Sequence, residues 1–198
     1  MPAGPDRSLA TPFAQAQRTD PAGRYCRAVR TVELILDDAL DDTVREVWAR
    51  LHAAGLPSLA THDHPTNRPH LTVAVAADLP PAVTDALAAL PLTVQLGEVH
   101  AFAPPPGSRR GGAVVWRVVP DDDLRSLHAA VWAALDGVET SPMHTPDMWD
   151  PHISLALRAR PEAASEALAL LSDLGPARGL FTGARSYDLR SRDLRQLA

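Results

Sequence analysis

Two stretches of the sequence, RPHLTVAVA (68–76) and WDPHISLAL (149–157), decide the fold and point to the function. In each stretch a Pro-His pair opens a run of alternating aliphatic residues, a pattern typical of a half-buried β-strand. Each strand therefore begins with a histidine, His70 in the first and His152 in the second.

Residues i and i+2 on a strand point to the same side. His70 thus shares a face with Thr72, and His152 shares a face with Ser154, while the aliphatic residues between them face the other way. Alanines continue the histidine face of both strands. We expect these small side chains to leave room for a ligand.

The two histidine strands occupy equivalent places in an internal duplication of about 82 residues, since 152 − 70 = 82. Each half reads as strand, helix, histidine strand, Pro-started helix and strand. The first helix is predicted to begin at its candidate caps Asp41, Asp42 and Thr43. The expected strands are 31–37, 70–76, 92–102 (with a bulge or bend at Gly97), 113–119, 152–159 and 179–191.

A repeat of this length suits a small α/β lobe. We therefore predict an α+β fold with two pseudo-twofold-related α/β lobes, each with an antiparallel-type sheet and helices outside, forming a central cleft. The lobes are expected at about 31–102 and 113–191. Both belong to a single domain, 29–198, which follows a flexible N-terminal tail, 1–28.

The composition excludes several kinds of chemistry. All 19 basic residues are Arg, so a Lys Schiff base, a lysyl–nucleotide intermediate and a Walker-type phosphate loop are ruled out. The net charge of −5 does not favour binding along a length of nucleic acid. Cys26 is the only cysteine, and no apolar run reaches the length of a membrane span. We expect a cytoplasmic protein.

The paired histidines suit the cleavage of a phosphodiester. One imidazole can deprotonate the attacking oxygen while the other protonates the leaving oxygen, because the ordinary pKa of histidine lies near neutrality. The Thr72 and Ser154 hydroxyls can donate to the non-bridging phosphate oxygens. This chemistry needs no cofactor and no metal. The pseudo-symmetry leaves open which histidine is the acid and which the base.

These two motifs resemble those of the 2H phosphoesterases, which include 2'-5' RNA ligase-like proteins and cyclic phosphodiesterases. The resemblance covers roughly residues 30–191. It implies a bilobal fold with His70 and His152 as catalytic pair and Thr72 and Ser154 as phosphate ligands. It also implies activity on 2',3'-cyclic phosphate ends or 2'-5' linkages. Ligase-like members often carry Arg five residues after the second histidine, where this chain has Leu157.

Other interpretations compete with this one. Either histidine can be a structural residue, and His62, His64 and His70 can be read as a metal site, although no carboxylate or cysteine spacing supports one. Trp149 is a possible base-stacking residue or simply packs its loop. Arg68 and Arg158 are possible substrate contacts, although ion-paired or solvated arginines are commoner.

The sequence thus predicts a metal-independent phosphodiesterase for RNA ends or small nucleotides, whose reaction can also run in the direction of a 2'-5' RNA ligase. The alternative is a non-catalytic RNA-end or nucleotide-binding module with the same cleft. The expected partner is an RNA terminus or a small nucleotide. No membrane and no protein partner are implied, and we expect a monomer.

Overall fold

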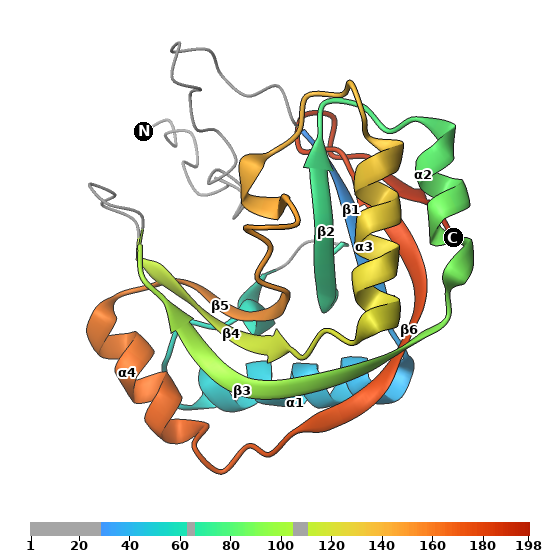
Figure 1. The fold of residues 1–198 in the computed structure, drawn as a ribbon. Helices are drawn as coiled ribbons and strands as arrows, with labels where there is room; N and C mark the ends of the chain where they lie inside the picture. The colour runs from blue at the N-terminus through green and yellow to red at the C-terminus, as the bar shows by residue number, and fades with distance from the viewer. Residues whose placement is uncertain (1–28, 63–65, 105–110) are drawn as a thin grey trace, which may run out of the picture.

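The computed structural model describes residues 29–62, 66–104 and 111–198 (Figure 1). The predicted tail, 1–28, lies outside the described residues. So do His64 of the alternative metal site and most of the loop after residue 103.

Within the described residues, seven antiparallel strands form one sheet in the order β1-β2-β5-β4-β3-β6-β7, and β1 also pairs with β6. The six longer strands thus form a closed ring of pairings. One link in this ring is narrow, because β2 and β5 pair only at Leu71 and Ile153. The strands are β1 (Arg30–Leu36), β2 (His70–Ala76), β3 (Leu92–Phe102), β4 (Gly112–Val118), β5 (His152–Ala159), β6 (Ala177–Tyr187) and β7 (Leu194–Gln196).

The pairing interleaves the two halves of the chain. The first two strands of each half pair with each other, as β1 with β2 and β4 with β5. The third strand of each half pairs with the first strand of the other half, as β3 with β4 and β6 with β1. Neither predicted sequence repeat therefore forms a sheet of its own.

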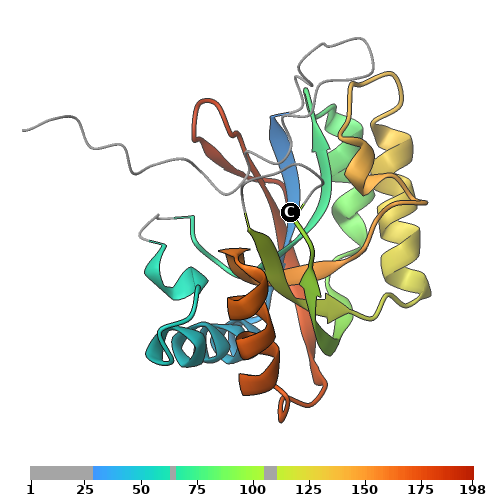
Figure 2. The same ribbon diagram turned by 90° about the vertical axis from the view of Figure 1, so that its left-hand side faces the viewer.

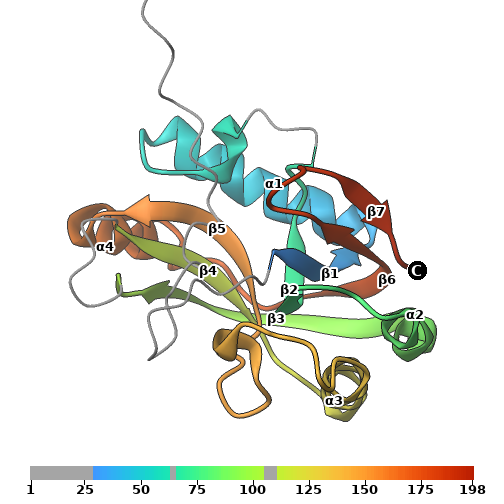
Figure 3. The same cartoon turned by 90° about the horizontal axis from the view of Figure 1, so that it is seen from above.

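The helices lie outside the strands in two pairs on opposite sides (Figures 2 and 3). α1 (Asp38–Ala53) and α4 (Pro161–Leu170) form one pair, joined by Arg50, which donates to the Leu170 carbonyl at 2.6 Å. α2 (Pro81–Ala86) packs on α3 (Asp122–Ala134) to form the other. No helix in the described part of the chain is long and apolar enough to cross a membrane.

One hydrophobic core joins both halves. It contains the aliphatic faces of β2 and β5, including Leu71 and Ile153, together with Trp48 of α1. Ala74 and Ala156 also lie in this core, and each is at most 1% exposed. The expectation that the alanines leave room for a ligand was therefore wrong. The β1–β2 register shifts between Val32 and Glu33, and the β4–β5 register shifts between Val114 and Val115. Each shift inserts one extra residue into the histidine strand, which turns the following alanine toward the core.

The strands β2, β3 and β5 have the predicted bounds, and the β3–β4 register shifts between Leu96 and Val99, where a bulge was expected at Gly97. β1 and β4 begin and end one residue earlier than predicted, and β6 begins two residues earlier. Two other boundaries differ by more. α1 begins at Asp38, because Asp37 rather than Asp41 caps it. β6 ends at Tyr187, because the chain turns after Asp188 and returns as β7, which was not predicted.

Asp37 joins three elements at the end of β1. Its Oδ1 accepts from the backbone N–H of Leu40 at 2.8 Å, which caps α1, and its Oδ2 accepts from the N–H of Leu180 in β6. We expect Asp37→Ala to lower the free energy of unfolding by about 1–2 kcal/mol, because both N–H groups lose a charged acceptor. Urea denaturation measures this loss. Asp42→Ala, at an exposed position of the same helix, is the control, and equal stability of the two variants would contradict the role of Asp37.

Candidate active site

Each histidine follows a proline and turns its ring back toward the chain. Nδ1 of His70 lies 2.7 Å from the carbonyl oxygen of Arg68, and Nδ1 of His152 lies 2.6 Å from that of Asp150. A carbonyl oxygen only accepts hydrogen bonds, so Nδ1 is the nitrogen that carries the proton in both rings. Nε2 is then the nitrogen at which each ring can take up or release a proton.

The pairing of Leu71 with Ile153 brings the two motifs together. Because the strands are antiparallel, this register sets His70 opposite Ser154 and Thr72 opposite His152. Side chains directly opposite each other lie roughly 5 Å apart at Cβ. The four side chains are half-buried, whereas Leu71 and Ile153 are 1% and 0% exposed. The structure therefore brings together the four residues predicted from the sequence.

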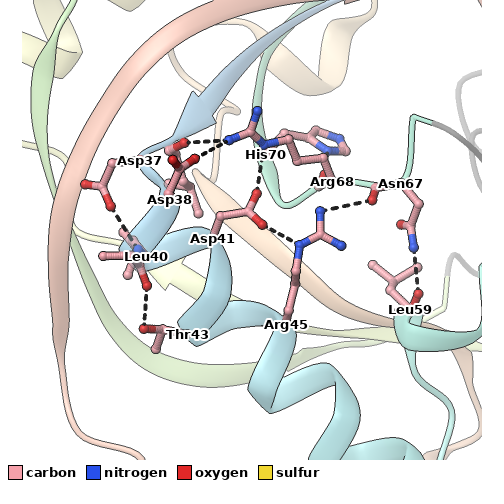
Figure 4. A network of polar contacts seen from close by, with 12 residues as sticks. Asp37, Asp38, Leu40, Asp41, Thr43, Arg45, Leu59, Asn67, Arg68 and His70 are labelled. Atoms are coloured by element: carbon pink, nitrogen blue, oxygen red, sulfur yellow. Dashed lines mark hydrogen bonds and ion pairs between the residues drawn. The ribbon is translucent and has the colours of Figure 1, made fainter.

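Ion pairs hold Arg68 and Asp150, the residues whose carbonyl oxygens accept these hydrogen bonds. Arg68 donates from Nε to Asp41 Oδ2 at 2.9 Å, and Asp41 also pairs with Arg45 (Figure 4). Asp150 is bound through both its oxygens by Arg117 of β4, at 2.6 and 3.2 Å. The guanidinium of Arg68 is therefore engaged in an ion pair with the buried Asp41.

Two tryptophans hold the backbone of the hydroxyl residues. Trp48 donates from Nε1 to the Ser154 carbonyl at 3.0 Å, and Trp149 donates to the Thr72 carbonyl at 3.0 Å. Trp149 also stacks in parallel on His128, with 3.9 Å between ring centroids. Trp149 therefore packs its loop against β2. His128 is only 3% exposed because α3 turns it toward this loop.

Burial is the largest influence on His152 and lowers its pKa. The hydrogen bond to the Asp150 carbonyl and the Asp150 charge act in the opposite direction. The charges of His70 and Arg117 lower the pKa further, and the result is below the ordinary value. A neutral imidazole with Nδ1 protonated has a lone pair on Nε2, so His152 is suited to accept a proton.

His144 lies in the loop before β5 and was not assigned a place from the sequence. Burial, with the charges of His152 and His128, lowers its pKa to about 4. Its Nδ1 is buried without a hydrogen-bond partner in the described structure. His144 is therefore a neutral ring near His152 at physiological pH.

Sequence reasoning missed Glu33, a buried carboxylate beside His70. It lies on β1, with Oε1 3.7 Å from Nε2 of His70. Burial by itself raises the pKa of Glu33, but the charges of His70 and Arg185 and the hydrogen bonds from Thr31 and Arg185 together lower it. The signal in the sequence was a single acidic residue inside the apolar strand TVELIL.

Arg158 lies at a break in the β4–β5 register, where Gly112 pairs with Ala159 and Ala113 pairs with Leu157. Its φ of 57° places it in the left-handed region, and its side chain is exposed. Among the described residues, no group of three or more His, Cys, Asp or Glu side chains has an arrangement that could hold a metal ion.

Several solved structures are similar in fold. Usb1 of Kluyveromyces marxianus aligns over 86% of this chain and 98% of its own, with 9% identity and a TM-score of 0.50. A structure described as a phosphoesterase aligns over 86% of this chain and 96% of its own, with 22% identity and a TM-score of 0.48. The protein TT0787 of Thermus thermophilus aligns over 80% of this chain and 86% of its own, with 17% identity and a TM-score of 0.49. No curated protein matches the sequence.

The family profile of the 2'-5' RNA ligase superfamily matches residues 81–188. This match covers more than half of the chain and includes the second motif, with His152 and Ser154. The chain therefore belongs to the 2'-5' RNA ligase superfamily of 2H phosphoesterases.

Proposed function

We propose that this protein is a metal-independent phosphodiesterase that acts on 2',3'-cyclic phosphate RNA ends or on 2'-5' linked or cyclic nucleotides. His70 and His152 are its general acid and base, and Thr72 and Ser154 bind the phosphate. The observation that carries this proposal is the placement of two imidazoles, each with Nδ1 bound to a backbone carbonyl, on one face of β2 and β5 with two hydroxyls between them.

The reaction that this arrangement supports is in-line displacement at phosphorus. A neutral imidazole takes a proton from the attacking water, the new P–O bond forms, and the bond to the ribose oxygen on the far side breaks. The protonated imidazole gives its proton to that leaving oxygen. Hydroxyls of Thr72 and Ser154 donate to the non-bridging oxygens, where charge increases in the transition state.

We place the phosphate in a cleft at the point where β2 meets β5. The strands on its two sides come from both sequence repeats, 31–102 and 113–191, because β3 pairs with β4 and β6 pairs with β1. Because the sequence holds no Lys to carry an activated nucleotide, ligation by this protein starts from a cyclic phosphate, with a ribose 5'-hydroxyl in place of water as the nucleophile. The hydroxyl gives its proton to the base, the new P–O bond forms, and the ring bond to the leaving ribose oxygen breaks as that oxygen is protonated. Water is the more abundant nucleophile, so hydrolysis dominates.

The competing function is a non-catalytic module that binds RNA ends or nucleotides at the same place. The neutral His152 favours the enzyme, because binding a phosphate anion alone would favour a cationic group there. Assays with uridine 2',3'-cyclic phosphate, a 2'-5' dinucleotide and an RNA ending in a cyclic phosphate test the proposal. Binding without turnover of all three would establish the module instead.

Removing either imidazole tests the catalytic pair. We expect His70→Ala and His152→Ala each to lower turnover by roughly a hundredfold or more, because each removes one of the two proton transfers. The double variant should be little slower than either single variant, because the two groups act in one step. His52→Ala, at an exposed position of α1, is the control. Single variants with near wild-type turnover would refute the mechanism.

The hydroxyls of Thr72 and Ser154 should contribute less to kcat/KM than the two histidines do. Thr72→Ala and Ser154→Ala each remove one hydrogen bond to phosphate and leave both proton transfers in place. We expect a smaller loss of kcat/KM than in the histidine variants, measured on the same cyclic phosphate. A loss as large as that of His70→Ala would assign the hydroxyl a direct part in proton transfer.

Activity should persist after chelation. The proton transfers proposed here use imidazoles alone, so dialysis against EDTA should leave the rate of cyclic phosphate hydrolysis unchanged. If EDTA abolishes the rate and a divalent ion restores it, the metal-independent mechanism is wrong and the His62, His64 and His70 site becomes the better interpretation.

A further inference from the structure

The two halves of the fold differ at one buried position beside the histidines. β1 and β4 occupy equivalent places, since Glu33 pairs with Thr72 as Val115 pairs with Ser154. Both residues are buried, with 1% and 0% of their surface exposed. One histidine strand is therefore paired with a carboxylate where the other is paired with a hydrocarbon.

The carboxylate of Glu33 is held in one orientation. Oε2 accepts from Nε of Arg185 in β6 at 2.8 Å, and Oε1 accepts from the Thr31 hydroxyl at 2.8 Å. Oε1 is also the oxygen that lies 3.7 Å from Nε2 of His70. Arg185 in turn donates to the Thr66 carbonyl at 2.9 Å. The charge therefore sits beside the nitrogen of His70 that exchanges protons.

The surroundings of His152 are different. The Phe102 ring meets His152 edge to face at 5.0 Å between centroids, and Val115 lies on the neighbouring strand. The nearby ionic pair, Asp150 with Arg117, has side chains 41% and 46% exposed, so water screens its charges. By comparison, the side chains of Glu33 and Arg185 are only 2% and 8% exposed.

We propose that Glu33 assigns the two catalytic roles, by holding the proton on His70 so that His70 is the general acid and His152 the general base. This inference rests on the proposed phosphodiesterase function. Glu33 is a positioning residue, since it acts through His70 and not on the substrate. The lowered pKa of His152 agrees with a base that is neutral at physiological pH.

The charges facing His70 set the sign of each test. Glu33 favours the imidazolium, whereas Arg185, Arg68 and a protonated His152 disfavour it. Glu33→Gln removes the favourable charge and leaves Arg185 unneutralised, so His70 should lose its proton at lower pH. Arg185→Gln leaves the carboxylate unneutralised, so His70 should keep its proton to higher pH. Glu33→Asp keeps the charge, and Glu46→Gln removes an exposed carboxylate of α1 as the matched control.

The first measurement is the titration of the His70 ring in the ligand-free protein, followed by NMR. We expect the midpoint to fall by about one pH unit in Glu33→Gln and to rise in Arg185→Gln, with little change in Glu33→Asp or Glu46→Gln. The double variant Glu33→Gln/Arg185→Gln removes both charges of the ion pair. Its His70 midpoint should therefore lie between those of the two single variants. This double variant also covers the case in which Glu33→Gln fails to fold because Arg185 is left unpaired.

The second measurement is the pH profile of kcat/KM for uridine 2',3'-cyclic phosphate. A bell shape is expected, and its limbs belong to the coupled pair of imidazoles. The alkaline limb should move to lower pH in Glu33→Gln and to higher pH in Arg185→Gln, while the acid limb stays nearly in place. Movement of the acid limb instead, or of neither limb, overturns the proposal.

The third measurement separates acid from base, which a pH profile alone does not. A nitrophenyl phosphodiester has a leaving group that needs no proton. His70→Ala should therefore recover most of its lost rate on this substrate, while His152→Ala should not. Recovery by His152→Ala, or by both variants alike, overturns the assignment.

Failure of the proposed function would look different from failure of this inference. If no substrate is turned over, the phosphodiesterase proposal fails, and with it the acid and base roles. The NMR titration still decides whether Glu33 holds the proton on His70. If turnover is present but the His70 midpoint does not move in Glu33→Gln or in the double variant, only the role of Glu33 is refuted.

Discussion

A single backbone pairing, between Leu71 and Ile153, holds β2 against β5, and the geometry of the site depends on it. A shift of one residue in this register would turn one motif toward the buried side of the sheet. The pairing does not extend, because other groups occupy the edge of β2 beyond it. The Trp149 side chain donates to the Thr72 carbonyl, and the backbone N–H of Ser141 donates to the Val75 carbonyl. The strands therefore part just beyond the histidines, and these stay partly exposed.

Proline gives each histidine its orientation. A residue before proline favours extended backbone, so the carbonyls of Arg68 and Asp150 lie beside the rings that follow them. Binding Nδ1 to such a carbonyl fixes both the ring and its tautomer. The side chains at these two positions carry opposite charges, yet each is held by an ion pair, Arg68 with Asp41 and Asp150 with Arg117. The two halves thus reach the same geometry with different residues.

Local pattern was enough to predict the strands that carry the site. Alternation along 70–76 and 152–159 gave their bounds and the side that each histidine faces, because strand periodicity is a property of neighbouring residues. Pairing between distant segments is not encoded locally. For that reason the interleaving of β3 and β6, the added strand β7 and the burial of Ala74 did not follow from the sequence. Glu33 was missed for the same reason, since its partner Arg185 lies on a strand of the other half.

A duplicated fold supplies two equivalent imidazoles, whereas acid–base catalysis needs one with a proton and one without. Some feature must therefore make the halves unlike near the site. Val115 shows that the fold accommodates a hydrocarbon at the position equivalent to Glu33, so packing alone does not require a carboxylate there. A buried ion pair is also a poor source of stability, because removing two charges from water costs about as much as their attraction returns. Glu33 and Arg185 are better understood through the ring they adjoin, since a fixed charge 3.7 Å from Nε2 acts directly on proton exchange at that nitrogen of His70.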